Sequence, residues 1–261
     1  INDLVLERAE LPMPELLTEK NMRQIRAAEK LIRKKRRQYE NQNRQFADMK
    51  PDGQLAEYLD RATFINKDGD TCEFTRLQKH DLNLVLQKRY ALLNWQQGSG
   101  KTAAVYHRAK YLLKFNKVRN VIILAPAIAT NMTWIPFLSM NRERFRVVRN
   151  NTDLETVPEG VFLILSTSML SKLERGLSQF VRRTSGKLCL VFDESDEITN
   201  PSSQRTRLVL SIFRRLKYKI LDTGTTTRNN IAELYSQFEL LYNNSVNMVC
   251  WCDRIYHENR D

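Results

Sequence analysis

The sequence predicts an α/β fold in which a central, mainly parallel sheet is flanked by helices. Short apolar runs alternate with helix-compatible stretches along the chain, a pattern typical of parallel strands that are buried on both faces. One of these runs leads into a glycine turn and then into a helix, which is the order that a phosphate-binding loop requires. With 261 residues, the chain is long enough to bury a full core and to carry an appendage.

The chain is strongly basic, with 42 Lys and Arg residues against 30 Asp and Glu residues and a formal net charge of +12. A surface of this sign attracts polyanions, with nucleic acid the first candidate and anionic membranes the second. Charge that only keeps the protein soluble is the alternative. No apolar run approaches the roughly 20 residues that a membrane span needs, so we expect no membrane insertion.

The start of the sequence and the distribution of its cysteines indicate the extent of the chain and the cellular compartment. The chain begins with Ile1, and no charged and then apolar leader precedes a small-residue cleavage site, so we expect a segment of a longer protein. The four cysteines are scattered, which is typical of cytosolic proteins and not of a disulfide framework. We therefore expect an intracellular protein that acts in the cytoplasm, the nucleoid or the nucleus.

Residues 15–49 contain no Gly or Pro and predict one long helix. Its apolar stripe recurs every seven positions and can lie against a domain or a partner helix; it consists of Ile25, Ile32, Tyr39 and Phe46. A basic run at 30–37 is either a solvated face or a contact to phosphate backbones. We divide the chain into an N-terminal helical appendage, a central α/β lobe and a C-terminal tail, at residues 1–53, 54–243 and 244–261.

Residues 54–73 predict a short helix and then a hairpin turn at 66–70. A second helix begins near Phe74 and leads toward the glycine turn. It carries Gln78, about twenty residues before that turn. The amide of Gln78 offers a donor and an acceptor and can therefore pair with an adenine edge, whereas an ordinary surface glutamine is the alternative.

The segment from 90 to 115 predicts the phosphate-binding loop itself. An apolar strand at 90–93 runs into the glycine turn, and a helix at 103–115 follows. Glycines let the backbone curl with its N–H groups inward, next to the positive end of the helix dipole. Lys101 would reach the β- and γ-phosphates of ATP, and the Thr102 hydroxyl would bind Mg²⁺.

The predicted nucleotide-binding residues are Gln78, Gln97, Gly98, Ser99, Gly100, Lys101 and Thr102. Trp95 departs from the usual pattern, because a small residue normally opens such a loop. A bulky residue is tolerable there only if its side chain points away from the phosphates. A plain glycine turn before a helix is the alternative to a nucleotide site.

Four further apolar runs predict buried parallel strands, at 120–126, 161–167, 188–194 and 218–224. Helix-compatible stretches lie between them, at 128–140, 168–183 and 204–217. Ligands of such sheets bind at the carboxyl ends of the strands. One of these strands ends in Asp193 and Glu194, and two acids at this point are costly unless they hold a metal or a water.

Asp193 and Glu194 therefore complete the predicted site. Asp193 is suited to bind Mg²⁺, usually through a water. Glu194 is suited to orient and deprotonate the attacking water. With Lys101 they form the predicted catalytic set, and Thr102 and Asp193 form the predicted metal set. Acids that only cap a helix after the strand are the alternative.

Two stretches resemble motifs of the Swi/Snf-like branch of superfamily 2 helicases. Asp193-Glu194 followed by residues 200–206 resembles the second motif. Residues 223–230 followed by 232–234 resemble the third, with Thr226 where the family usually has proline. Type I restriction motor subunits have a similar glycine loop, so that branch is the alternative.

The resemblance extends over residues 74–243 and also implies a DNA-binding face. Ala125-Pro126 with Trp134 resembles the motif that grips the DNA backbone, and Ser166-Thr167 falls where the next DNA contact lies. The resemblance implies a first RecA-like motor domain that binds ATP and Mg²⁺ and tracks double-stranded DNA. Thr223, Gly224 and Thr225 would couple the γ-phosphate to that DNA.

A motor of this family also carries a second RecA-like lobe, and we expect it to be missing from this chain. We therefore expect an ATP hydrolase that is weak or inactive as an isolated lobe. Cys250, Cys252 and His257 lack a fourth ligand and a suitable spacing, so we expect no zinc site there. The remaining alternatives are an ATP-gated binding module that does not translocate and a P-loop kinase or metabolic ATPase that binds no nucleic acid.

Overall fold

The computed structural model describes residues 48–184, 186–224 and 233–242, and in addition isolated residues between 19 and 41. The chain divides into two compact units, of which one is Lys50–Val246 and the other is Ile1–Met49 with Asn247–Asp261. The described residues between 19 and 41 are helical, in agreement with the helix expected there.

Several sequence-based expectations lie outside the described residues. They concern the apolar positions Tyr39 and Phe46, the Thr225 and Thr226 positions, and the tail with Cys250, Cys252 and His257. The proposed domain boundaries at 53 and 243 also stay predictions.

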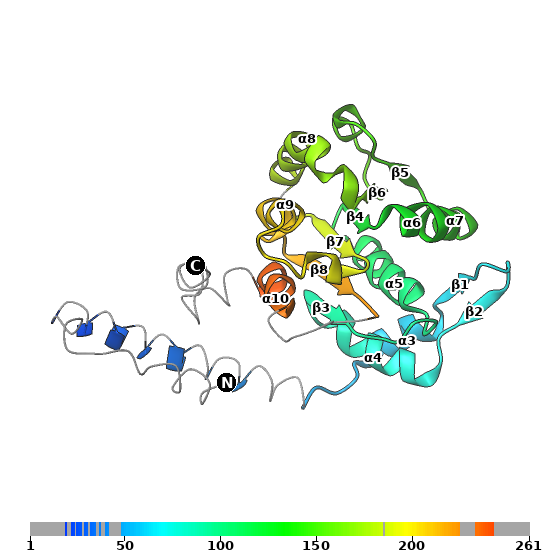
Figure 1. Ribbon diagram of the computed structural model, residues 1–261. Coiled ribbons are helices and arrows are strands. Elements are labelled where there is room, and N and C mark those ends of the chain that lie inside the picture. The colour runs from blue at the N-terminus through cyan, green and yellow to red at the C-terminus, as the bar shows by residue number, and fades with distance from the viewer. Residues whose placement is uncertain are drawn as a thin grey trace. The chain divides into compact units, whose positions relative to one another are not determined.

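The unit Lys50–Val246 is built on a six-stranded sheet with the order β3-β8-β7-β4-β6-β5, shown in Figure 1. All of its strand pairs are parallel. The strands are β3 (Tyr90–Leu93), β4 (Asn120–Ala125), β5 (Phe145–Val147), β6 (Phe162–Ser166), β7 (Leu188–Phe192) and β8 (Tyr218–Asp222). Every residue of β4 and β7 is buried, as expected for continuous apolar runs at the centre of a parallel sheet.

Helices cover both faces of this sheet (Figure 1). They are α3 (Gly53–Asp60), α4 (Arg76–Leu86), α5 (Lys101–Lys114), α6 (Ala127–Ala129), α7 (Ile135–Met140), α8 (Leu170–Arg183), α9 (Gln204–Phe213) and α10 (Leu234–Tyr242). Single-turn helices connect several of them: the π-helix η1 (Thr130–Trp134) and the 3₁₀-helices η2 (Asn151–Leu154), η3 (Thr167–Met169) and η4 (Ser195–Ile198). A hairpin of β1 (Thr63–Ile65) and β2 (Thr71–Glu73) precedes α4.

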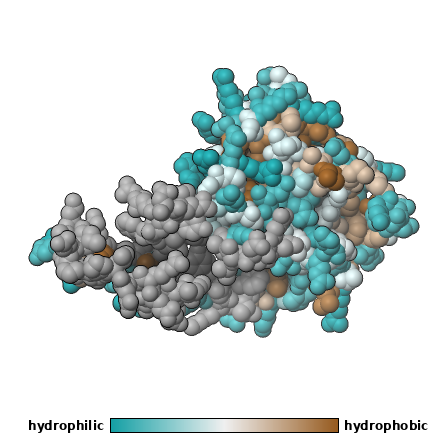
Figure 2. Space-filling model, in the orientation of Figure 1, coloured by the Kyte–Doolittle hydropathy of each residue, from teal (hydrophilic) through white to brown (hydrophobic). Residues whose placement is uncertain are grey.

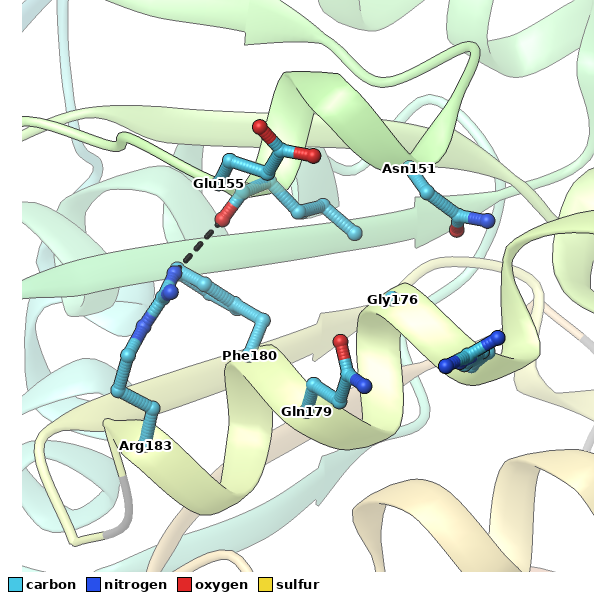
Figure 3. Close-up of a pocket in the computed structure, with 8 residues that line it drawn as sticks. Asn151, Glu155, Gly176, Gln179, Phe180 and Arg183 are labelled. Carbon is cyan, nitrogen blue, oxygen red and sulfur yellow. Dashed lines mark hydrogen bonds between the residues drawn. The ribbon is translucent and has the colours of Figure 1, made fainter.

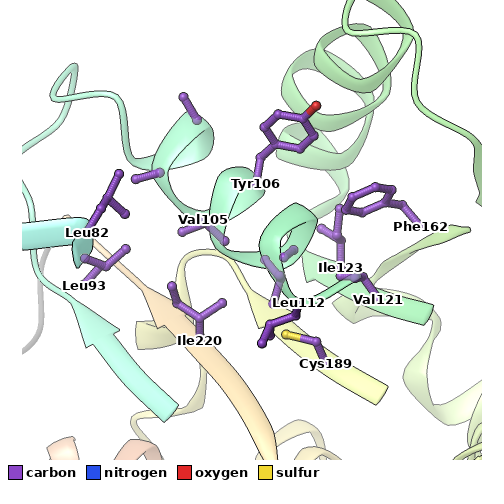
Figure 4. Close-up of a cluster of buried hydrophobic side chains, with 14 of the residues drawn as sticks. Leu82, Leu93, Val105, Tyr106, Leu112, Val121, Ile123, Phe162, Cys189 and Ile220 are labelled. Atoms are coloured by element: carbon purple, nitrogen blue, oxygen red, sulfur yellow. The ribbon is translucent and has the colours of Figure 1, made fainter. Parts of the chain in front are cut away.

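Alternate residues of each strand face opposite sides, so the sheet separates two hydrophobic cores. In β4, Val121 and Ile123 belong to the core under α3, α4 and α5, part of which Figure 4 shows. Ile122 and Leu124 belong to the core under α8, α9 and α10. The predicted α/β fold with a mainly parallel sheet is therefore confirmed.

The structure differs from the expected elements at three places. Strand β5 was not expected, because its three residues, Phe145-Arg146-Val147, are too few and too polar to stand out from a loop. The helix expected at 128–140 consists of three pieces, α6, η1 and α7. The C-terminal helix α10 was also not anticipated. In the described part of the chain, no helix is long and apolar enough to cross a membrane.

Candidate nucleotide-binding site

The glycine loop lies between β3 and α5 and adopts a conformation that its glycines permit. Gly98 and Gly100 have φ angles of +77° and +82°, a left-handed region that other residues rarely adopt. Gly100 is the N-cap of α5 and has no side chain that could bond to the first N–H groups of the helix. These N–H groups and the helix dipole can therefore meet an anion at the start of α5, where Thr102 lies half-buried.

Gln78 braces this loop from the first turn of α4. Its Oε1 accepts a hydrogen bond from the Thr75 backbone N–H at 2.8 Å, which completes a capping box. Its Nε2 donates to the Ser99 carbonyl oxygen at 2.8 Å. By valence, the amide retains one N–H and one lone pair with which it could meet an adenine edge. The structure thus gives Gln78 a structural role, and adenine reading stays a prediction.

We expect Gln78→Ala to lower the free energy of unfolding by about 1–2 kcal/mol in the absence of nucleotide, because a capping box and a loop contact are lost. Urea unfolding measures this loss. The matched control is Gln179→Ala on the exposed side of α8, which should change stability by less than about 0.5 kcal/mol. Equal stabilities of the two variants would contradict the bracing role, and a changed preference for ATP over GTP in Gln78→Ala would identify adenine reading separately.

Lys101 is the first residue of α5, and its ammonium group turns back over the loop. Nζ donates to the carbonyl oxygens of Trp95 at 3.1 Å and Gln96 at 3.4 Å. It also borders the segment after β8, because a β-carbon built on Gly224 would lie 3.5 Å from Nζ. The Gln97 Cγ atom would lie 3.3 Å from the same β-carbon. The loop and the predicted third motif therefore meet at Gly224.

The bulky Trp95 is accommodated because its side chain packs against the hydrophobic core under α4 and α5. The residue contributes its carbonyl oxygen to the loop and its ring to the interior. The Trp95 side chain therefore points away from the predicted phosphate site, which is the condition under which a large residue is tolerable at the start of the loop.

Asp193 follows β7 and is 8% exposed. Its Oδ2 accepts a hydrogen bond of 2.7 Å from the indole Nε1–H of Trp134. Its carboxyl also shares a hydrogen bond with that of Asp222, the last residue of β8. Asp193 is therefore held from two sides by residues of neighbouring segments.

Glu194 has a φ angle of +52°, which is unusual for a residue other than glycine. Such strained positions cost about 1–3 kcal/mol and cluster at functional sites. Burial raises the pKa of the Glu194 carboxyl, and the negative charges of Asp193 and Asp196 raise it further. The Lys101 ammonium and a hydrogen bond from the Gly224 N–H oppose that increase. Glu194, Lys101 and Gly224 thus share one electrostatic environment.

Asp222 is an acid of the site that the sequence reasoning missed. It is 1% exposed, and among the described residues its Oδ2 receives no hydrogen bond. Burial raises its pKa well above the usual value, followed by the charge of Asp193 and the hydrogen bond between the two carboxyls. The sequence feature that could have identified Asp222 is its position as an acid at the end of an apolar strand, directly before Thr223.

Thr223 links the segment after β8 to the turn after β7, because its Oγ1 donates to the Asp196 Oδ1 at 3.2 Å. Both residues are buried. In the same turn, the Ser195 hydroxyl donates to the Gln237 Oε1 of α10 at 3.0 Å. Hydrogen bonds therefore connect η4 to β8 on one side and to α10 on the other.

The residues expected to contact DNA lie at the carboxyl ends of β4 and β6. Ala125 pairs with Ser166 across these neighbouring strands. The side chains of Ala125 and Thr167 are buried, so they do not present a surface to DNA. Pro126 and Ser166 are half-buried and remain the candidates for side-chain contact at this edge. DNA contact itself stays a prediction.

The chemical groups at the loop are of the types that bind a magnesium nucleotide. An uncapped helix start and Lys101 suit phosphate oxygens, while Thr102 and Asp193 supply oxygen ligands. The described residues contain no group of three or more His, Cys, Asp or Glu side chains placed to hold a metal alone.

A cavity of about 260 Å³ lies elsewhere, between η2 and α8, and Figure 3 shows its lining. Arg183 crosses one end of it, where Nη2 donates to the Leu154 carbonyl oxygen at 2.7 Å. Strand β5, which leads into η2, is at the opposite edge of the sheet from β3 and its glycine loop. This cavity is therefore separate from the candidate site.

The parallel sheet, the glycine loop before α5 and the acids after β7 define the class of the domain. It is a RecA-like α/β domain, the fold of helicase motor cores. No family model matches the chain. A stretch of 109 residues is 31% identical to the DNA annealing helicase and endonuclease ZRANB3 of Bos taurus, and it covers 42% of this chain and 10% of that protein.

Two solved structures share the fold. The Sulfolobus solfataricus SWI2/SNF2 ATPase core in complex with dsDNA superposes with a TM-score of 0.54 at 20% identity, over 65% of this chain and 36% of that one. The UvsW helicase from bacteriophage T4 superposes with a TM-score of 0.50 at 15% identity, over 72% of this chain and 64% of that one. Both likenesses show the fold that the predicted resemblance to a Swi/Snf-like domain implies.

Proposed function

We propose that this chain supplies the ATP-binding first lobe of a DNA-dependent ATPase or translocase, which hydrolyses ATP with Mg²⁺ and moves along double-stranded DNA. The observation that carries the proposal is the meeting of Lys101, Glu194 and Gly224. These residues follow β3, β7 and β8, which are adjacent in the sheet, and the Lys101 ammonium opposes the rise in the Glu194 pKa that burial causes. Opposed charges beside an uncapped helix start suit a bound triphosphate.

Each residue has a distinct task in this proposal. Lys101 exchanges the Trp95 and Gln96 carbonyl oxygens for phosphate oxygens, and the first N–H groups of α5 bind the phosphates from the helix side. Thr102 and Asp193 would hold a magnesium ion, which would neutralise phosphate charge. Glu194 orients a water and accepts its proton. Gly224 and Thr223 lie where they can respond to the γ-phosphate.

Three observations, separate from the nucleotide site, support the proposal that the protein binds DNA. The carboxyl ends of β4 and β6 lie at the same edge of the sheet as the nucleotide site, the chain has a formal net charge of +12, and the relatives named above include a DNA annealing helicase. The matched stretch spans a tenth of that relative, so a second lobe and its arginine fingers are part of the proposal. We expect the first lobe alone to hydrolyse ATP very slowly.

Duplex DNA should raise ATP hydrolysis by the full-length protein by about tenfold or more. Phosphate release is measured with and without duplex DNA across a salt series. The stimulation should weaken as salt rises, because contacts to DNA phosphates release counterions. Heparin, a polyanion with no base-paired strands and no phosphodiester backbone, is the control and should stimulate less. Hydrolysis that is unaffected by DNA at every salt concentration would contradict a DNA-dependent motor.

A further inference from the structure

The helical segment after β4 contains an irregular turn with an identifiable cause. Residues 127–140 form α6, the π-helix η1 and α7 in succession. Pro136 lies at the start of α7; it has no N–H, and its ring crowds the carbonyl of the residue four positions earlier. The wider π-turn precedes this proline, and the Ile135 N–H donates to the Thr130 carbonyl oxygen. Such single π-turns frequently occur at functional sites.

The π-turn ends at Trp134, whose indole reaches the candidate site. Trp134 is fully buried, at 0% exposure, and its Nε1–H donates to the Asp193 Oδ2 at 2.7 Å. Because indole has one N–H and no acceptor, its polar group is committed to this carboxylate. A buried carboxylate loses its hydration, so a fixed donor of this kind determines which way its oxygens point.

The outer side of the same segment is exposed and uncharged. Ile128 is 78% exposed and Met132 is 76% exposed, four residues apart along the segment. Figure 2 shows hydrophobic surface over this part of the molecule. The segment begins after Pro126, where the sequence predicts a DNA contact. One side of this segment therefore faces solvent at the predicted DNA edge, while Trp134 bonds to Asp193 inside.

We propose that Trp134 is a positioning residue that orients the Asp193 carboxylate for Mg²⁺ and couples it to the segment 126–134. The inference rests on the proposed function and deepens it. Movement of the segment when DNA binds shifts the indole, and the indole shifts the carboxylate to which it donates. The Trp134 bond is the contact that joins this carboxylate to the segment 126–134, whereas Asp222 contacts it from β8.

The test uses the full-length protein with the variant Trp134→Phe, which keeps an aromatic ring but removes the donor. Binding of a fluorescent ATP analogue is titrated with Mg²⁺, with and without duplex DNA. We expect the Mg²⁺ concentration at half-maximal binding to rise about tenfold, as is usual when a residue behind a metal ligand is lost. Binding without Mg²⁺ should stay unchanged, and the effect of DNA on the Mg²⁺ midpoint should fall by more than half.

Phe137→Leu is the matched packing control. Phe137 packs against Trp134 with ring centroids 6.4 Å apart but makes no bond to Asp193. It should lower thermal stability without moving the Mg²⁺ midpoint. A Trp134→Phe midpoint within twofold of the wild type, or an equal shift in Phe137→Leu, would overturn the positioning role.

A double-mutant cycle isolates the path through Asp193. In an Asp193→Ala background, Trp134→Phe should cause no further change in the Mg²⁺ midpoint, since the two changes act through one carboxylate. Additive effects would overturn the inference. If the wild type shows no Mg²⁺-dependent nucleotide binding and Lys101→Ala leaves binding unchanged, the proposed function fails and the inference fails with it.

Discussion

Lys101→Ala is expected to weaken nucleotide binding by about 100-fold and to abolish measurable ATP hydrolysis. The ammonium group lies between the loop and Gly224, and its charge opposes the rise in pKa that burial causes in both Glu194 and Asp222. Without it, a bound triphosphate would face the acids after β7 and β8 with no opposing charge from the loop. Titration of a fluorescent ATP analogue with the full-length protein measures the loss.

Lys114→Ala provides the matched control, because Lys114 is the last residue of the same helix and lies over the Tyr58 ring, far from the loop. Its nucleotide affinity should stay within about twofold of the wild type. If both variants bind nucleotide as the wild type does, Lys101 has no phosphate to hold and the candidate site is wrong.

Glu194→Gln is expected to slow ATP hydrolysis by about 100- to 1,000-fold while nucleotide binding is retained or tightened. Glutamine keeps the length of the side chain and can still accept from the Gly224 N–H, but it cannot take a proton from water. Single-turnover hydrolysis separates this chemical loss from any change in binding.

Glu197→Gln is the corresponding control in the same short turn. Glu197 forms an ion pair with Arg205 at 3.3 Å and is not part of the predicted catalytic set. Hydrolysis by this variant should stay within about twofold of the wild type. Equal losses in the two variants would indicate a general disturbance of η4 and would contradict a specific role for Glu194.

The central strands could be predicted from the sequence because burial on both faces leaves uninterrupted apolar runs. Val121 to Ala125 and Leu188 to Phe192 are fully buried and contain no charged residue. Edge strand β5 contains Arg146, so the same signal is missing. The π-turn at Thr130–Trp134 also escaped prediction, because its cause, Pro136, lies inside the following helix and usually only indicates a helix start or a kink.

The candidate site was predictable where a motif fixes both residue type and backbone, as in the loop from Gly98 to Thr102. Its supporting contacts were not predictable, because they join side chains from distant strands. The bond from Trp134 to Asp193 and the pairing of Asp193 with Asp222 depend on the strand order, which no local pattern states. The left-handed backbone of Glu194 likewise has no signal in residue type.

The bonds from Lys101 to the carbonyl oxygens of Trp95 and Gln96 have a consequence for affinity. A single ammonium has three donors, and two of them already have partners within the chain. The phosphate of an incoming nucleotide must therefore displace these carbonyl oxygens before it can interact fully with the Lys101 ammonium. In the free protein, these loop carbonyl oxygens compete with the nucleotide for Lys101. A change that weakens their hydrogen bonds to Lys101 should therefore tighten nucleotide binding.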